Sequence, residues 1–489
     1  MNPLIAALNL IIAQGCMGAF DTIYHHELRA ALPEQPNAAL ELGIHAGRSL
    51  LYGGLFMGLA WLWWGGMWLF LLGGILMAEV VLTLWDFLVE DRTRPLPPAE
   101  RVLHTIMALN GGAAFVLLCL YAPVWWKAPT GLSLVNHGWQ SVVLSIFALG
   151  VVVSGLRDAA ASATLRECAL HVPSFDFGKA PQRLLITGGT GFIGQLLCEA
   201  LLRQGHEITL LVRDPLKAAH QFQGKAHCVT TLADLSPDTE FDVIVNLAGE
   251  RVLGPRWTAK RRDRLVASRV DTTQAIVAWI ARASHKPRLT ISASAIGYYG
   301  VQRPDDTTAL AEDSQPQHDF LSELCQAWEE AARKVTQYGV ALAILRFGLV
   351  LGHQGALPRM RLPFKLGLGG PIGSGRQVVS WIHVEDIVGV IAWLMTNPDS
   401  HAVEGTYNLT APQAHAQKEF AKTLAGVLHR PAIAWLPGPV VRCALGEQAM
   451  LVLEGQRVYP ARLLKGGYRF RFPELDLALR DLCNANASD

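Results

Sequence analysis

The pattern of apolar and polar residues changes about a third of the way along the chain. Five apolar stretches come first, each with roughly the 20 residues of helix that cross a hydrocarbon core: residues 3–20, 47–64, 67–89, 102–122 and 139–156. From residue 183 onward, short apolar runs alternate with amphipathic segments. Strands that alternate with helices form parallel sheets. The pattern therefore predicts an all-α bundle of about five transmembrane helices, followed by an α/β domain with a doubly wound parallel sheet.

Charge follows the same division. Only 17% of the 489 residues are charged, whereas about 25% is typical of soluble proteins. Residues 1–165 carry 17 of the 83 Asp, Glu, Lys and Arg residues, so the rest of the chain has a nearly normal share. We therefore expect the first third to lie in a lipid bilayer and the remainder in water. The net charge of +1, without a basic block, predicts no nucleic-acid partner.

Basic residues near the ends of the apolar stretches predict an orientation. One side of the bundle is expected to hold seven arginines and the other only Lys127. Cytoplasmic loops carry the excess of Lys and Arg, so we expect residues 166–489 in the cytoplasm, at a bacterial-type inner membrane. Eight scattered cysteines without CxxC spacing fit reduced thiols there. The arginines are Arg29, Arg48, Arg92, Arg94, Arg101, Arg157 and Arg166.

Ionisable residues gather at the same ends of the apolar stretches, and Glu79 lies within the third one. Such groups at membrane depth are costly and usually functional. The favoured interpretation is ion pairing with neighbouring arginines, which assigns no metal ligand. The alternative is a site for iron, zinc or haem, since histidine and carboxylate suit such metals. The residues are Asp21, His25, His26, Glu27, His45, Asp86, Glu90, Asp91 and His104, and the arginines are Arg48, Arg92, Arg94 and Arg101.

A glycine-rich segment joins the first strand of the α/β part, at 183–187, to a helix that runs to about residue 204. A GxGxxG segment in that context is a dinucleotide fingerprint, because the backbone must approach the pyrophosphate and the helix N-terminus binds it. Leu247, Ala248 and Gly249, at the end of the strand at 242–247, are expected to complete the cofactor pocket. The segment is Gly188, Gly189, Thr190, Gly191, Phe192, Ile193 and Gly194.

The end of the next strand, at 207–213, selects between the two nicotinamide cofactors. An acidic residue there hydrogen-bonds the adenosine ribose of NAD, whereas an arginine accommodates the 2′-phosphate of NADP. Arg213 stands at this point, although Asp214 follows it at once. The sequence therefore favours NADP(H) as the cofactor over NAD(H).

A series of motifs then gives a family resemblance. Over residues 182–485 the chain looks like a member of an atypical, epimerase-like branch of the extended short-chain dehydrogenase/reductases (SDRs). The resemblance implies a Rossmann-type domain at 183–430 and a small C-terminal domain of unknown function at 431–489, after a transmembrane domain at 1–165 and a linker at 166–182. The motifs are GGTGFIG (188–194), NLAGE (246–250), RWT (256–258), SRV (268–270), SASAIGYYG (292–300), LRFGLVLG (345–352), LGLGGPIGSGRQ (366–377) and SWIHVED (380–386).

The resemblance also implies a catalytic set, from which this sequence departs. The usual chemistry needs a serine, matched by Ser294, and a Tyr-x-x-x-Lys on the next helix. Leu321 and Cys325 occupy the tyrosine and lysine positions, and neither side chain can perform that proton transfer. Arg269 stands where an asparagine often completes the set. The catalytic candidates that the sequence leaves open are Ser294, Tyr299 or its neighbour Tyr298, Cys325 and His383.

Together these patterns predict a membrane-anchored, NADP(H)-dependent oxidoreductase or epimerase-like enzyme at the cytoplasmic face, with a small or lipid-linked substrate. Two other functions stay open. In one, the soluble part binds NADP(H) as a sensor or scaffold without turnover. In the other, it passes electrons from NADPH to a haem, metal or quinone held by His25, His26, His45 and His104.

Overall fold

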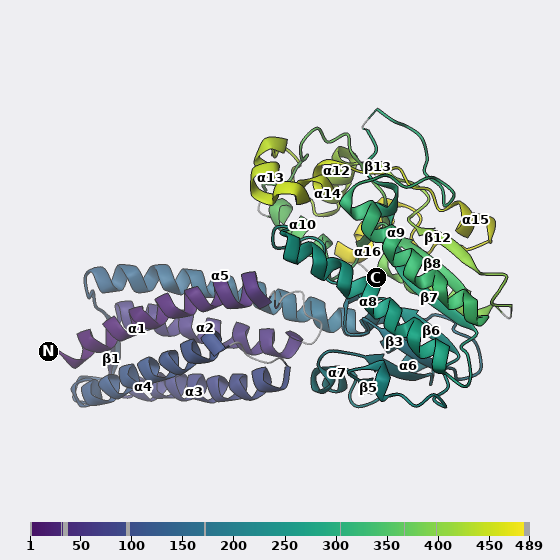
Figure 1. Ribbon diagram of the computed structural model, residues 1–489. Coiled ribbons are helices and arrows are strands. Elements are labelled where there is room, and N and C mark those ends of the chain that lie inside the picture. Colours follow the sequence, from purple (N-terminus) through teal and green to yellow (C-terminus); the bar gives the residue numbers. More distant parts are fainter. Residues whose placement is uncertain are drawn as a thin grey trace. The chain divides into compact units, whose positions relative to one another are not determined.

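The chain forms two compact units, Met1–His171 and Val172–Asp489 (Figure 1). The computed structural model describes residues 2–30, 32, 38–93, 98–170, 173–303, 305–365, 367–397 and 399–483. Each unit has a hydrophobic core of its own, and the boundary falls inside the linker predicted at 166–182. The further division of the second unit at residue 430 stays a prediction.

The first unit is a bundle of long helices. Its elements are α1 (Pro3–Phe20), a π-helix (Asp21–Ala30), α2 (Ala39–Trp61), β1 (Leu62–Gly65), α3 (Trp68–Thr93), α4 (Pro98–Trp126), β2 (Gly131–Leu134) and α5 (Trp139–Leu170). All five α-helices contribute to the core, with one leucine from each at most 2% exposed: Leu8, Leu59, Leu72, Leu118 and Leu144. β1 and β2 pair as a short antiparallel ribbon. α1 continues directly into the π-helix, a rare form that often marks functional sites.

Four helical segments of the described chain are long and apolar enough to cross a membrane: Pro3–His26, Trp68–Asp91, Pro98–Trp126 and Trp139–Ala163. They overlap four of the five predicted spans, so the prediction of five is corrected to four. The exception is 47–64, because this stretch contains Arg48 and its helix, α2, gives way to β1 after Trp61. The predicted orientation rests in part on residues whose side chains lie outside the described ones: Arg29, Arg92, Arg94 and Arg166.

The second unit is built on a seven-stranded parallel sheet with the order β12-β8-β7-β6-β3-β4-β5. The strands are β3 (Arg183–Thr187), β4 (Glu207–Leu211), β5 (His227–Val229), β6 (Val243–Asn246), β7 (Leu289–Ala295), β8 (Ala341–Phe347) and β12 (Gly405–Leu409). From β3 the chain adds β4 and β5 on one side. It then returns to the other side of β3 and adds β6, β7, β8 and β12. Ligands of such sheets bind outside the strand carboxyl ends at this switch point.

Helices cover both faces of this sheet. One core joins the sheet to α6 (Phe192–Arg203) and α11 (Val384–Thr396), and a second core joins it to α8 (Ala259–Arg282) and α9 (Phe320–Arg333). The predicted Rossmann-type, doubly wound arrangement is therefore confirmed for the second unit.

The C-terminal residues pack into the second unit. α10 (Leu357–Lys365), α12 (Gln417–Val427) and α16 (Leu475–Cys483) share a core in which Leu424 and Leu479 are fully buried. The smaller elements are α7 (Pro215–Gln221), β9 (Leu349–Leu351), β10 (Val378–Val379), β11 (Trp381–His383), β13 (His415–Ala416), α13 (Gly438–Leu445), α14 (Met450–Leu453) and α15 (Ala461–Lys465).

Candidate functional site

The glycine-rich segment forms a tight loop between β3 and α6 at the switch point of the sheet. Gly188 has a φ of +71°, and a Cβ there would lie 2.6 Å from the carbonyl oxygen of Leu247. A Cβ on Gly194 would lie 2.2 Å from the carbonyl oxygen of Gly188. Gly191 caps α6 without a side chain, so the first amide groups of the helix are open to an anion. The backbone geometry is therefore that of a pyrophosphate-binding loop.

The end of β6 lies directly against this loop. The backbone N–H of Leu247 donates to the carbonyl of Thr187 (3.1 Å), and that of Ala248 donates to the Thr187 hydroxyl (3.2 Å). Next along the chain, Gly249 leaves room for the guanidinium of Arg269, which a Cβ would approach to 3.2 Å. The structure thus brings together the two segments that the sequence assigned to the cofactor.

Arg213 lies just beyond β4, the strand next to β3, and its side chain is exposed. The neighbouring Asp214 has a different task, because its carboxylate accepts the backbone N–H of Lys217 (3.0 Å) and caps α7. Asp214 is therefore engaged by the helix. Contact of the exposed Arg213 with the 2′-phosphate stays a prediction.

A second group of polar side chains lies further along the sheet, on three neighbouring strands. Ser294 of β7 is in register with Arg346 of β8, which is in register with Asn408 of β12. Glu329 of α9 joins them. It accepts a hydrogen bond from Ser294 (2.8 Å) and two from Arg346, at 2.8 Å to Oε1 and 2.9 Å to Oε2. The sequence identified only Ser294 of this set; a lone arginine within the apolar run 341–347 was the available signal for Arg346.

Tyr299 is bound into the same network from a short 3₁₀ helix (Ile296–Tyr299). Its hydroxyl donates to Asn408 (2.7 Å) and accepts from Arg346 (2.8 Å). Burial raises the pKa of Tyr299 to about 12, and the nearby Arg346 only partly offsets this. Tyr299 is thus a neutral, fully engaged phenol near neutral pH. By contrast, Tyr298 is half-buried, with the Arg346 guanidinium 3.4 Å from its ring centroid.

Cys325 and His383 are both buried, at 4% and 1% exposed. Burial, together with the charge of Glu329, raises the pKa of the Cys325 thiol to about 12. His383 caps α11, because its Nδ1 accepts the backbone N–H of Glu385 (3.2 Å), and its ring packs on Phe472 with centroids 3.9 Å apart. Their catalytic roles, like those of Ser294 and Tyr299, stay predictions.

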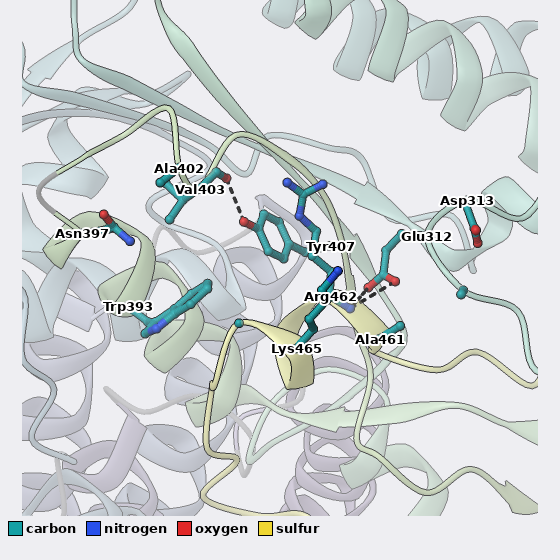
Figure 2. Close-up of a pocket in the computed structure, with 12 residues that line it drawn as sticks. Glu312, Asp313, Trp393, Asn397, Ala402, Val403, Tyr407, Ala461, Arg462 and Lys465 are labelled. Carbon is teal, nitrogen blue, oxygen red and sulfur yellow. Dashed lines mark hydrogen bonds between the residues drawn. The ribbon is translucent and has the colours of Figure 1, made fainter.

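A hollow of about 570 Å³ lies at the edge strand β12, and Figure 2 shows the side chains that line it. Within it the Tyr407 hydroxyl donates to the carbonyl of Val403 (2.8 Å), and Glu312 accepts the backbone N–H of Arg462 in α15 (3.2 Å). None of the residues lining this hollow belongs to the glycine loop, but Glu312 connects it to the Ser294 network. The Glu312 carbonyl accepts from Arg346 (3.2 Å), and its carboxylate accepts the backbone N–H of Asn408 (3.0 Å). The hollow is the seam where the C-terminal segment meets the sheet.

These features define a dinucleotide-binding α/β protein, and comparison with known proteins gives the family. A profile of the NAD dependent epimerase/dehydratase family matches residues 184–410, and one of a domain of unknown function (DUF1731) matches residues 436–482. Epimerase family protein YfhF of Bacillus subtilis is 38% identical over 305 residues, 61% of this chain and 97% of that protein. Human epimerase family protein SDR39U1 is 39% identical over 305 residues, 61% of this chain and 99% of that protein.

The chain belongs to the NAD dependent epimerase/dehydratase family. The crystal structure of human SDR39U1 (isoform 2) with NADPH is similar, with a TM-score of 0.55 and 37% identity over 62% of this chain and 99% of that one. The resemblance to an epimerase-like SDR with a C-terminal domain of unknown function is confirmed. At the level of the family, so is the expectation of a nicotinamide dinucleotide.

The raised pKa of Cys325 predicts low thiol reactivity. Only the thiolate is alkylated, and with a pKa of about 12 the Cys325 thiol stays protonated at about pH 8. In the folded protein, iodoacetamide should therefore label the exposed Cys443 and spare Cys325, as read by peptide mass spectrometry. Unfolded protein should label at both positions. Equal labelling in the folded state would contradict the buried, protonated thiol.

The pair formed by Glu329 and Arg346 predicts a large effect on stability. Glu329→Ala should lower the free energy of unfolding by about 3–5 kcal/mol, because it leaves a buried guanidinium without its partner. Chemical denaturation followed by tryptophan fluorescence measures this. Replacing both residues by leucine should cost less than Glu329→Ala alone, and Glu330→Ala, on the exposed side of α9, should cost under about 0.5 kcal/mol. A double variant as unstable as the sum of its single changes would refute the coupling.

Proposed function

We propose that the second unit binds NADPH at the carboxyl ends of β3, β4 and β6 and uses it in epimerase-like oxidoreductase chemistry. The observation that carries the proposal is the glycine loop at the switch point of the sheet. Its contacts exclude side chains at Gly188 and Gly194, and the N-terminus of α6 is left open to the pyrophosphate. The NADPH in the human relative's structure supports the choice of cofactor.

Arg213 gives the preference for NADPH over NADH in this proposal. A guanidinium binds a phosphate through charge-assisted hydrogen bonds, which are stronger than neutral ones. Arg213 is exposed beside the strand end where the adenosine ribose of such cofactors lies. Asp214 caps α7 through one carboxylate oxygen, which gives it a structural role beside Arg213.

For the chemical step we propose Tyr298 as the proton donor, with Ser294 as its neighbour at the reacting carbonyl. Hydride transfer to a carbonyl requires a proton on the oxygen, and a positioned hydroxyl supplies it. Tyr299 is the less suitable of the two tyrosines, because Asn408 and Arg346 already hold its hydroxyl. Tyr298 is half-buried and lies beside the same arginine.

We further propose that the first unit anchors this chemistry in a bilayer, with the second unit in the cytoplasm. Four apolar helices support this by their length and composition. Their outward side chains include Leu109, Leu149 and Phe70, which are 65–70% exposed. An apolar surface of this extent needs a cover, and lipid provides one. A lipid-linked or small amphipathic substrate fits such an anchored enzyme.

A second function, binding of NADPH without turnover, is favoured by one specific observation. Ser294 and Tyr299 are each 1% exposed and satisfy their hydrogen bonds within the protein. A site of this kind can hold a cofactor and report its presence without reaching a substrate. Turnover separates this function from the first.

Cofactor titration tests the proposed site. In the full chain in detergent, Arg213→Ala should weaken NADPH binding about 10- to 100-fold, since a hydrogen bond to a charged group contributes about 1.5–3 kcal/mol. NADH binding should stay unchanged. Arg203→Ala, an exposed arginine at the end of α6, is the matched control and should affect neither cofactor. Equal losses for NADPH and NADH would rule out 2′-phosphate recognition by Arg213.

NADPH oxidation distinguishes the enzyme from the sensor. We expect oxidation, followed by absorbance, to rise when vesicles of bacterial membrane lipid are added. It should fall about 100-fold in Tyr298→Phe, the usual scale for loss of a proton donor, while Tyr299→Phe should retain most of it. Gly194→Ala, which blocks the loop, gives the background rate. If the wild-type protein binds NADPH but oxidises it no faster than Gly194→Ala with every lipid fraction, the sensor function is favoured.

A further inference from the structure

One end of the first unit holds a buried cluster of histidines and carboxylates. Among its members, Glu100 is 1% exposed, Asp21 6% and His26 9%. The sequence favoured arginine partners for these groups, and two such arginines are seen among the described side chains. Arg48 binds Asp86 (2.5 Å) and approaches Glu79 (3.5 Å), and Arg101 lies 4.0 Å from Asp91 at the surface. The side chains of Glu27, Arg92 and Arg94 lie outside the described residues.

Histidines and carboxylates of the cluster also contact one another. His104 Nε2 lies 3.1 Å from Asp21 Oδ2, and His26 Nε2 lies 3.4 Å from the same oxygen. The distance from His26 Nε2 to Glu100 Oε1 is 3.8 Å. One donor atom from each of these four side chains lies within 4.8 Å of the other three. Two nitrogens and two oxygens therefore lie close enough together to bind one ion.

We propose that Asp21, His26, Glu100 and His104 bind one divalent first-row transition-metal ion. A tetrahedral ion with ligands at 2.0–2.1 Å places them about 3.3 Å from each other, close to the separations observed here. Imidazole together with carboxylate, without thiolate, suits zinc, iron(II) or manganese(II). This site is independent of the NADPH proposal, and no family match assigns it.

Local helix geometry explains how four residues converge from two elements. Asp21 and His26 are five positions apart in the π-helix, where i→i+5 hydrogen bonding stacks such positions on one face. In an α-helix the same spacing would point them in different directions. Glu100 and His104 are four apart on α4, the spacing that shares a face of an α-helix. Each element thus offers one histidine and one carboxylate to the other.

Outer contacts hold these side chains in the way that metal ligands are held. A ligating histidine normally gives its second ring nitrogen to a carboxylate, and His104 Nδ1 lies 3.3 Å from Glu90 Oε2. His25 Nδ1 lies 2.8 Å from Asp21 Oδ1. The His26 ring stacks on His45 with centroids 4.6 Å apart. His45 Nε2 in turn lies 3.2 Å from Asp86, the carboxylate that binds Arg48.

A haem fits this site less well than a single ion. Haem iron takes axial ligands from opposite sides of a macrocycle, so the space between the two histidines would have to admit a porphyrin. Here the carboxylates of Asp21 and Glu100 lie within 4.8 Å of both histidine nitrogens. That space is therefore already occupied by ligand oxygens.

Metal analysis of the full chain in detergent tests the proposal. We expect about one equivalent of zinc, iron or manganese per chain by plasma mass spectrometry. Glu100→Gln combined with His104→Gln should retain less than a tenth of it, and His137→Gln should retain all of it. His137 is a histidine of the same unit that follows β2, beyond the other end of α4. Glu90→Gln, outside the ligand set, should weaken binding about 10- to 100-fold.

A second measurement keeps the test decisive if the double variant does not fold. Wild-type protein stripped with a chelator should bind one equivalent of cobalt(II) and show the visible absorption of a four-coordinate ion with nitrogen and oxygen ligands. NADPH affinity reports independently that the second unit is intact. A metal-free preparation that also fails to bind zinc, iron(II), manganese(II) or cobalt(II) would overturn the proposal. So would equal binding by a folded double variant, or a haem spectrum in the purified protein.

Discussion

The paired charges of Arg346 and Glu329 hold the carboxyl end of the sheet in one arrangement. Removing each charge from water costs several kcal/mol, which only a close, well-oriented partner offsets. Glu329 outweighs the effect of burial on Arg346 and raises the pKa of that guanidinium. Because Arg346 also binds Tyr299, and Glu329 also binds Ser294, the pair fixes the hydroxyl groups at the edge where a substrate would lie. Glu329 of this ion pair lies beside Cys325 on the same helix, where the sequence lacks the family's usual tyrosine and lysine.

The first unit also buries charged groups, and it does so with histidines near its carboxylates. Among the described residues, its buried carboxylates outnumber the buried guanidinium groups, and buried histidines contact several of these carboxylates. Histidine can be neutral or charged near neutral pH, so such a cluster has no fixed charge of its own. In the proposed site, a divalent ion would place two positive charges beside Asp21 and Glu100. The buried carboxylates are Asp21, Glu41, Glu79, Asp86, Glu90, Glu100 and Asp158.

Local signals in the sequence predicted the tight glycine loop between β3 and α6, which the structure shows. The glycine segment and Arg213 could be predicted from the sequence because each lies directly next to a strand along the chain. Arg346 and Asn408 were missed, because their importance depends on the pairing of β8 with β7 and β12. The second predicted span, 47–64, was wrong because it contains Arg48 and the helix ends at Trp61, within the stretch. The π-helix escaped detection because its repeat differs from the helical period used to read the sequence.

The π-helix also bears on how this region tolerates change in length. Deleting one residue between Asp21 and His26 would let the segment relax into an α-helix, with the two side chains now four apart. They would still share a face, but every residue after the deletion would rotate by about a quarter turn relative to the bundle. In this segment the count of residues matters as much as their identity. A relative with one residue fewer in this segment would need a gap there for its histidines to align with His25 and His26.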